Sequence, residues 1–110
     1  NGYLQYAKVN LFDVYLDTTT NRVRQIGIAG PRFCTKGGVC LTAKGGLTKL
    51  KAQYGKALHR VKAEDGEVSW VVLGRYSGRR VFTSFTPGPG SRVVQVFIGT
   101  CPAPPTTCGA

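Results

Sequence analysis

Four cysteines in two local pairs constrain the fold of this chain more than any other feature of its sequence. Five residues separate Cys34 from Cys40 and six separate Cys101 from Cys108, in a chain of 110 residues. An even number of cysteines in so short a chain predicts two disulfides. Of the possible connectivities we favour Cys34–Cys40 with Cys101–Cys108, because the loop within each pair contains turn-forming glycine or proline residues.

Disulfides persist in oxidising compartments, so we expect a secreted protein, extracellular or periplasmic. A zinc site is not expected, because the cysteine spacings are longer than those of zinc ligands and His59 is the one histidine of the chain. An even set of cysteines also does not suggest a free nucleophilic thiol paired with His59. We therefore expect neither a metal nor another cofactor.

Length and composition predict a single domain over residues 1–110. The hydrophobic fraction of 42% is sufficient to fill a core. Apolar runs such as 70–73 are far shorter than the ~20 residues that span a bilayer. We therefore expect no transmembrane segment. We also expect the protein to be a monomer.

Residues 1–30 are predicted to form an N-terminal hairpin. Apolar residues alternate over 5–16 and change phase once, which predicts one long strand bent by a bulge. The turn-forming cluster 17–21 follows, and alternation resumes at Val23, which predicts the returning strand.

The middle of the chain is predicted to be a loop followed by a helix. Residues 31–46 contain the first cysteine pair and two Gly-Gly steps but no hydrophobic period, which indicates a Cys- and Gly-rich loop. From Leu47, apolar residues recur every three or four positions, which predicts a short amphipathic helix over 47–55 that ends at Gly55.

Residues 56–100 are predicted to form a four-stranded antiparallel meander, since turn-forming clusters separate four alternating runs. The run 67–76 is apolar on both faces, which predicts a central strand with Trp70 in the core or, as the second choice, serving as a ligand platform. The run 93–98 has the same pattern and is likewise predicted to be a central strand. Residues 101–110 are expected to be a tail tied down by its disulfide. The predicted fold class is α+β: a curved antiparallel sheet of about five to six strands, one short helix and two disulfides.

Residues 44–55 (Lys-Gly-Gly-Leu-Thr-Lys-Leu-Lys-Ala-Gln-Tyr-Gly), followed by the meander, carry a family resemblance. They resemble the glycine-bounded helix of the BamE/SmpA-type lipoproteins and of the beta-lactamase-inhibitor-protein repeat, over about residues 37–99. The resemblance implies a bacterial envelope or secreted protein with a helix packed on an antiparallel sheet. It also implies a non-catalytic surface that binds another macromolecule. No functional residue is carried over, and the family's paired helices are reduced to one here.

The net charge of +10 is the sharpest functional signal, because a strong positive field attracts polyanions whatever their sequence. Two clusters are predicted to bind an anionic polymer or surface, with Tyr54 or Tyr76 as a flat neighbour. The first accompanies the helix and the strand after it, and the second surrounds the Ser77-Gly78 turn. The candidate binding residues are Lys49, Lys51, Lys56 and Arg60 in the first cluster and Arg75, Arg79 and Arg80 in the second. A basic surface that serves only solubility explains the same residues.

Two other classes of function stay open. In a small secreted nuclease-like hydrolase or toxin, His59 and Glu67 would be the catalytic pair. In an inhibitor of an extracellular enzyme, a rigid loop, 32–36 or 87–90, would dock into a protein target. We favour a non-enzymatic secreted binding protein whose partner is an anionic polymer, an anionic surface or a protein.

Overall fold

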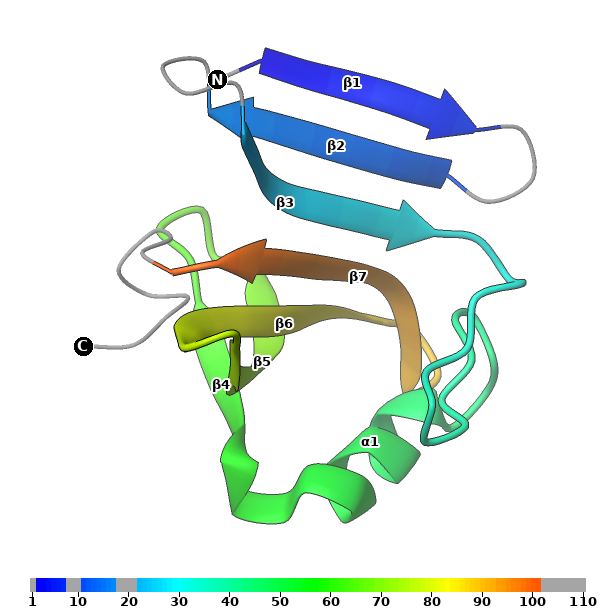
Figure 1. Ribbon diagram of the computed structural model, residues 1–110. Coiled ribbons are helices and arrows are strands. Elements are labelled where there is room, and N and C mark those ends of the chain that lie inside the picture. The colour runs from blue at the N-terminus through cyan, green and yellow to red at the C-terminus, as the bar shows by residue number, and fades with distance from the viewer. Residues whose placement is uncertain (1, 8–10, 18–21, 102–110) are drawn as a thin grey trace.

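Three strands, one helix and four further strands follow one another along the chain (Figure 1). The computed structural model describes residues 2–7, 11–17 and 22–101. The fold class is α+β, with one short helix and an antiparallel sheet. The elements in the described residues are β1 (Gly2–Ala7), β2 (Leu11–Asp17), β3 (Arg22–Ala29), α1 (Gly46–Tyr54), the 3₁₀ turn η1 (Gly55–Ala57), β4 (Leu58–Lys62), β5 (Val68–Tyr76), β6 (Arg79–Gly88) and β7 (Arg92–Thr100).

All of the described strands belong to one sheet, in the order β1-β2-β3-β7-β6-β5-β4. The sheet consists of two meanders, β1 to β3 and β4 to β7, and the last strand joins them by pairing with β3 (Figure 1). Between the meanders the chain leaves the middle of the sheet after β3, passes through the loop and α1, and returns at the far edge as β4.

The prediction of an N-terminal hairpin with one bent strand over 5–16 is wrong. β1 and β2 are separate antiparallel strands, paired from Gly2 opposite Leu16 to Ala7 opposite Leu11. The described part of the sheet therefore has seven strands rather than five or six. A bulge and a reversal of the chain both shift the phase of apolar alternation, so the pattern alone does not distinguish them.

The four-stranded meander predicted over 56–100 is confirmed. A two-residue connection, Ser77 and Gly78, joins β5 to β6, with φ of 50° and 77° respectively. Positive φ at both central residues is the geometry of a type I′ turn, which matches the right-handed twist of the flanking strands.

Replacing Gly78 by alanine is expected to cost about 1 kcal/mol, because a side chain at positive φ is strained even in open space. A Cβ at Gly78 would have no heavy atom within 4 Å, so the cost is conformational and not steric. Gly74 lies in β5, and its Cβ would make ordinary contact with Val81 at 3.8 Å. The matched control Gly74→Ala is therefore expected to be neutral or slightly stabilising. Urea unfolding of both variants checks this; equal costs would contradict the turn geometry.

The predicted helix is confirmed within one residue at each end. Gly45 precedes it at φ 78°, and Gly55 ends it by donating its N–H to the Lys51 carbonyl. The β6–β7 connection holds the first turn, since Leu47 N–H donates to the Ser91 carbonyl at 2.8 Å. The side-chain oxygens of Thr48 and Ser91 lie 2.9 Å apart, a second hydrogen bond between the same two segments.

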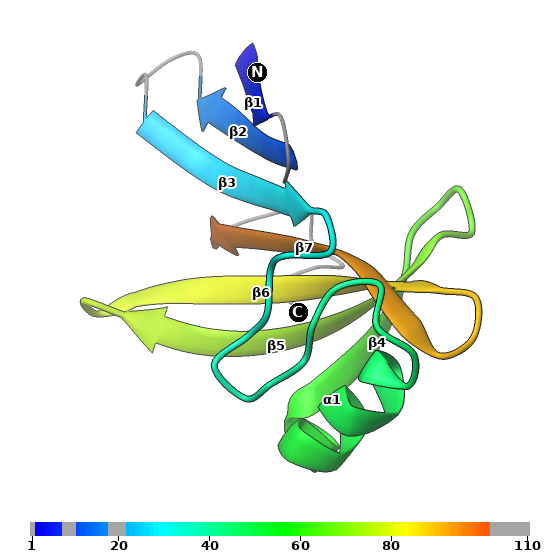
Figure 2. The same ribbon diagram turned by 90° about the vertical axis from the view of Figure 1, so that its right-hand side faces the viewer.

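The main core lies between one face of the sheet and a cover made of α1 and the loop before it (Figure 2). Leu50 of α1 has no exposed surface, and Val39 and Leu41 of the loop are 1% exposed each. Their partners from the strands are Ile28, Leu58, Phe85, Val93 and Val96, with Trp70 and Val72 packed at the margin.

A second cluster occupies the opposite face of the sheet around Val71 and Phe82. Trp70 and Val72 pack against the main core while Val71 belongs to the second cluster, so β5 is buried on both faces as predicted. Its expected central position is wrong, because β5 is next to the edge strand β4 and β7 is the middle strand. Although β5 is next to the edge, both of its faces are buried, because it has apolar side chains on each face of the sheet.

The disulfide Cys34–Cys40 is confirmed, with an S–S distance of 2.04 Å. It joins the two sides of a short hairpin, since the two cysteines also form an isolated β-bridge. Cys101 is disulfide-bonded as well. Cys108 and the predicted tail from residue 102 onward lie outside the described residues, so the pair Cys101–Cys108 stays a prediction. Within the described ranges, no helix is long and apolar enough to cross a membrane.

Candidate functional site

The side chain of Lys51 lies over the indole ring of Trp70. The Lys51 ammonium nitrogen lies 4.4 Å from the centroid of the indole ring, within the range of a cation–π contact. Lys51 is in the last turn of α1, where a positive charge also interacts favourably with the helix dipole. The indole is only partly buried: it packs against the main core and also has solvent-exposed surface.

Arg60 brings a second cation to the same place. It lies directly opposite Trp70 in the β4–β5 ladder, so the two side chains leave the sheet on the same face. β4 is the edge strand, and Arg60 and Lys51 are both exposed. We call Lys51, Arg60 and Trp70 the Trp70 patch. It presents two cations and a flat ring to solvent.

Lys49 does not join this patch. Its ammonium donates a hydrogen bond of 3.1 Å to the Gly38 carbonyl in the disulfide hairpin. One turn further along α1, Gln53 donates to the Gly37 carbonyl. This flank of the helix therefore holds the hairpin, and the Lys51 flank faces the Trp70 ring. Lys56 is exposed in η1, after the end of α1.

The predicted arginine cluster surrounds the β5–β6 turn. Arg75 lies opposite Arg80 and Tyr76 opposite Arg79, so Arg75 and Arg79 project to different faces of the sheet. The Arg75 guanidinium donates to the Gly78 carbonyl at 3.4 Å. Trp70 and Arg75 are five positions apart along β5, a span of about 17 Å. The two basic clusters are therefore separate surfaces.

The structure does not bring His59 and Glu67 together as a catalytic pair would require. His59 lies opposite Val71 in the β4–β5 ladder, whereas Glu67 N–H donates to Asp65 Oδ1 at 2.9 Å in the turn that joins those strands. The four residue steps from Glu67, just before β5, to Val71 span about 13 Å. The described residues contain no group of three His, Cys, Asp or Glu side chains that would hold a metal ion.

The disulfide hairpin has the rigidity that an inhibitory loop needs but not an extended backbone. Gly38 N–H donates to the Thr35 carbonyl at 2.9 Å, so residues 35–38 form a closed reverse turn with Lys36 exposed at its tip. The carbonyls of Gly37 and Gly38 are already bound by α1. A protein partner could therefore contact the Lys36 side chain but would find few unbonded backbone groups in this turn. In the second candidate loop, Arg92 Nη1 donates to the Pro89 carbonyl at 3.2 Å.

The aromatic partners differ from those expected. Tyr54 packs beside Phe85, with ring centroids 6.5 Å apart, and Trp70 is the flat neighbour of the first cluster instead. Tyr76 lies beside an apolar depression that was not anticipated, because its isoleucines alternate along their strands as core residues do.

Comparisons with known proteins leave the resemblance to BamE/SmpA-type proteins and to the beta-lactamase-inhibitor-protein repeat untested, so it stays a prediction. No protein-family model matches this chain, and neither a curated protein nor a solved structure does.

Proposed function

We propose that this chain is a non-enzymatic secreted protein that binds an anionic polymer through the Trp70 patch. The observation that carries the proposal is that Lys51 lies over one partly exposed indole ring while Arg60 is the cross-strand partner of the same residue, Trp70. Within the described residues, neither cation is paired with a carboxylate. Both charges are therefore free to meet anionic groups of a partner.

The patch suits a polymer better than a single small anion. Two cations and a flat ring side by side can contact successive charged units and the apolar surface between them. The patch lies at the edge of the sheet, where a long ligand can extend beyond it in both directions. The formal net charge of +10 adds attraction at long range.

Secretion and a monomeric state belong to the same proposal. The Cys34–Cys40 disulfide supports an oxidising compartment. The short edge strand β4 carries His59, Arg60 and Lys62, and such charged edges oppose pairing with a second sheet.

The test is binding to heparin and to a random DNA duplex across a salt series, for the wild type and for the double variant Lys51→Gln/Arg60→Gln. Removing two phosphate contacts is expected to reduce the slope of log K against log salt by about 1.8 for the duplex. At physiological salt the affinity is expected to fall on the order of tenfold. Lys36→Gln removes one charge from the disulfide hairpin and serves as the control, with at most a twofold loss.

An equal loss in the Lys36 control and in either single variant would mean diffuse attraction and would contradict a localised patch. No binding by the wild type at physiological salt would overturn the proposal. Breakdown of the heparin or DNA that disappears with His59→Ala would replace it with the hydrolase alternative.

A further inference from the structure

In the described part of the chain, one face of the sheet is buried at one end and exposed at the other. Ile28 and Val96 lie opposite each other under the loop and α1, in the main core. Two residues along the same strands, Ile26 and Ile98 form the next pair on this face. They are 36% and 41% exposed, so the apolar stripe continues past the edge of its cover.

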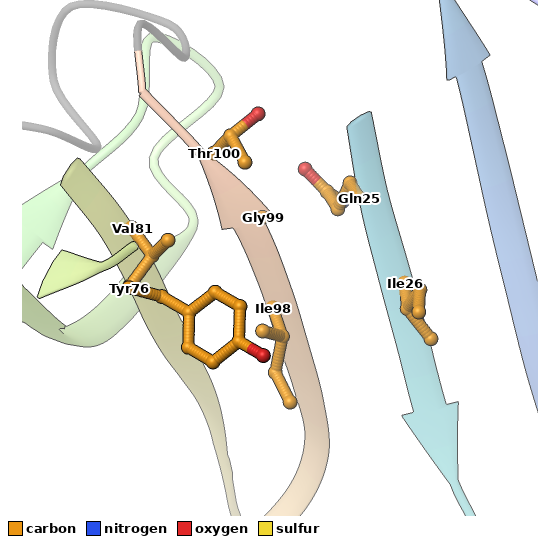
Figure 3. Close-up of a pocket in the computed structure, with 7 residues that line it drawn as sticks. All are labelled: Gln25, Ile26, Tyr76, Val81, Ile98, Gly99 and Thr100. Atoms are coloured by element: carbon orange, nitrogen blue, oxygen red, sulfur yellow. The ribbon is translucent and has the colours of Figure 1, made fainter. Parts of the chain in front are cut away.

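Tyr76 completes this bare surface. Its ring lies beside Ile98 in Figure 3, and the residue as a whole is 76% exposed. Ile26, Ile98 and Tyr76 are three of the four exposed large hydrophobic residues in the described part of the chain. They line one depression of about 330 Å³, at the lower end of the range of small-molecule sites. The lining residues are Gln25, Ile26, Tyr76, Val81, Ile98, Gly99 and Thr100.

The floor of this depression offers a ligand almost no main-chain hydrogen bonds. Six of the seven lining residues lie on β3, β7 and β6, which all have strands on both sides in the sheet order, and Tyr76 of β5 is the seventh. Their N–H and C=O groups are used in the ladders with those neighbours. A peptide backbone would lose its water here without replacement partners, whereas a hydrocarbon group needs none. The floor therefore favours a hydrocarbon over a peptide.

Arg79 places a cation next to one of the residues that line the depression. Arg79 is exposed and lies directly opposite Tyr76, so its side chain starts on the same face as the tyrosine ring. The lining residues that the structure describes include no Asp or Glu. An occupant with an anionic end would gain from Arg79 and meet no carboxylate in the lining.

We propose that this depression binds the hydrocarbon part of a small amphipathic anion, of the kind represented by a medium-chain carboxylate. The hydrocarbon lies against Ile26, Ile98 and Tyr76, and the carboxylate lies next to Arg79. This site shares no residue with the Trp70 patch. The proposal of decanoate binding therefore does not depend on whether the protein binds an anionic polymer.

The experiment is calorimetric titration with decanoate below its micelle concentration, with decyltrimethylammonium as the matched cation. Decanoate is expected to bind more tightly than the cation, and the difference is expected to shrink as salt is added. Ile98→Ser is expected to lower the decanoate affinity by roughly tenfold or more, through lost apolar contact. Arg79→Gln is expected to lower it about two- to fivefold. Tyr54→Ser, which alters the exposed hydrophobic residue outside the depression, is expected to leave it unchanged.

Amide shifts of the wild type on adding decanoate provide a readout that needs no variant, and they are expected at Gln25, Gly99 and Thr100. Ile26→Thr keeps a β-branched residue in β3 and is the substitute if Ile98→Ser lowers the melting temperature. Equal binding of anion and cation would overturn the proposal. Shifts confined to other strands, or binding to anionic vesicles without binding to monomeric decanoate, would overturn it as well.

Discussion

Phe85→Ala is expected to destabilise the fold by about 3–5 kcal/mol. Phe85 is 2% exposed and lies between Trp70 on one neighbouring strand and Val96 on the other. The ring of Tyr54 packs against it from the helix side. Removing the phenyl ring leaves a cavity that the two strands cannot close, because their ladders fix the spacing.

Urea unfolding followed by the fluorescence of Trp70, the single tryptophan, measures this cost directly. Total stabilities of small domains are about 5–15 kcal/mol, so a large part of the variant is expected to unfold at low urea. Tyr54→Ala is the control, because its side chain touches the same ring from a 39% exposed position and is expected to cost about 1 kcal/mol. A cost for Phe85→Ala as small as that of the control would show that the sheet and α1 do not share a packed core.

Removing the confirmed disulfide by Cys34→Ser/Cys40→Ser is expected to cost about 2 kcal/mol, the loop-closure entropy of a seven-residue ring. The loss is expected to reach the core, because Val39 and Leu41 lie within or next to this ring and are both 1% exposed. Leu41 N–H donates to the Phe33 carbonyl at 2.9 Å and fixes the second side of the hairpin.

Hydrogen exchange distinguishes a local effect from a global one. The Thr35 and Leu41 amides are expected to exchange much faster in the double variant, while the β5–β6 ladder changes only by the global loss of stability. Lys36→Gln, at the exposed tip of the same hairpin, is the control and is expected to leave both sets unchanged. Unchanged exchange at Leu41 would mean that Lys49 and Gln53 hold the hairpin without the disulfide.

The C-terminal half of the fold could be predicted because its signals are local. Gly66, Ser77-Gly78 and 87–90 mark three turns, and each separates runs with clear alternation. The order of the strands could not be predicted in the same way. That β7 lies beside β3 depends on contacts between residues more than sixty positions apart, and no local pattern encodes them.

Part of the Trp70 patch could have been predicted from the sequence. Lys49 and Lys51 are two positions apart on a helix, and side chains at that spacing do not share a face. Arg60 and Trp70 are equidistant from Asp65, so a turn centred there pairs them. The apolar depression could not have been predicted from the sequence. Ile26 and Ile28 occupy the same face of β3 and follow the same alternation, and they differ only because the loop and α1 cover Ile28 and not Ile26.

The position of β7 has a consequence for the order in which the chain can fold as it is made. β1 to β3 are synthesised before β4 to β7, yet their neighbour in the sheet is β7, residues 92–100, the last of the described strands along the chain. Until then the inner edge of β3 has no partner, and an unpaired edge favours association with other chains. A nascent chain stalled before Arg92 would therefore carry two separate meanders and an open edge on β3.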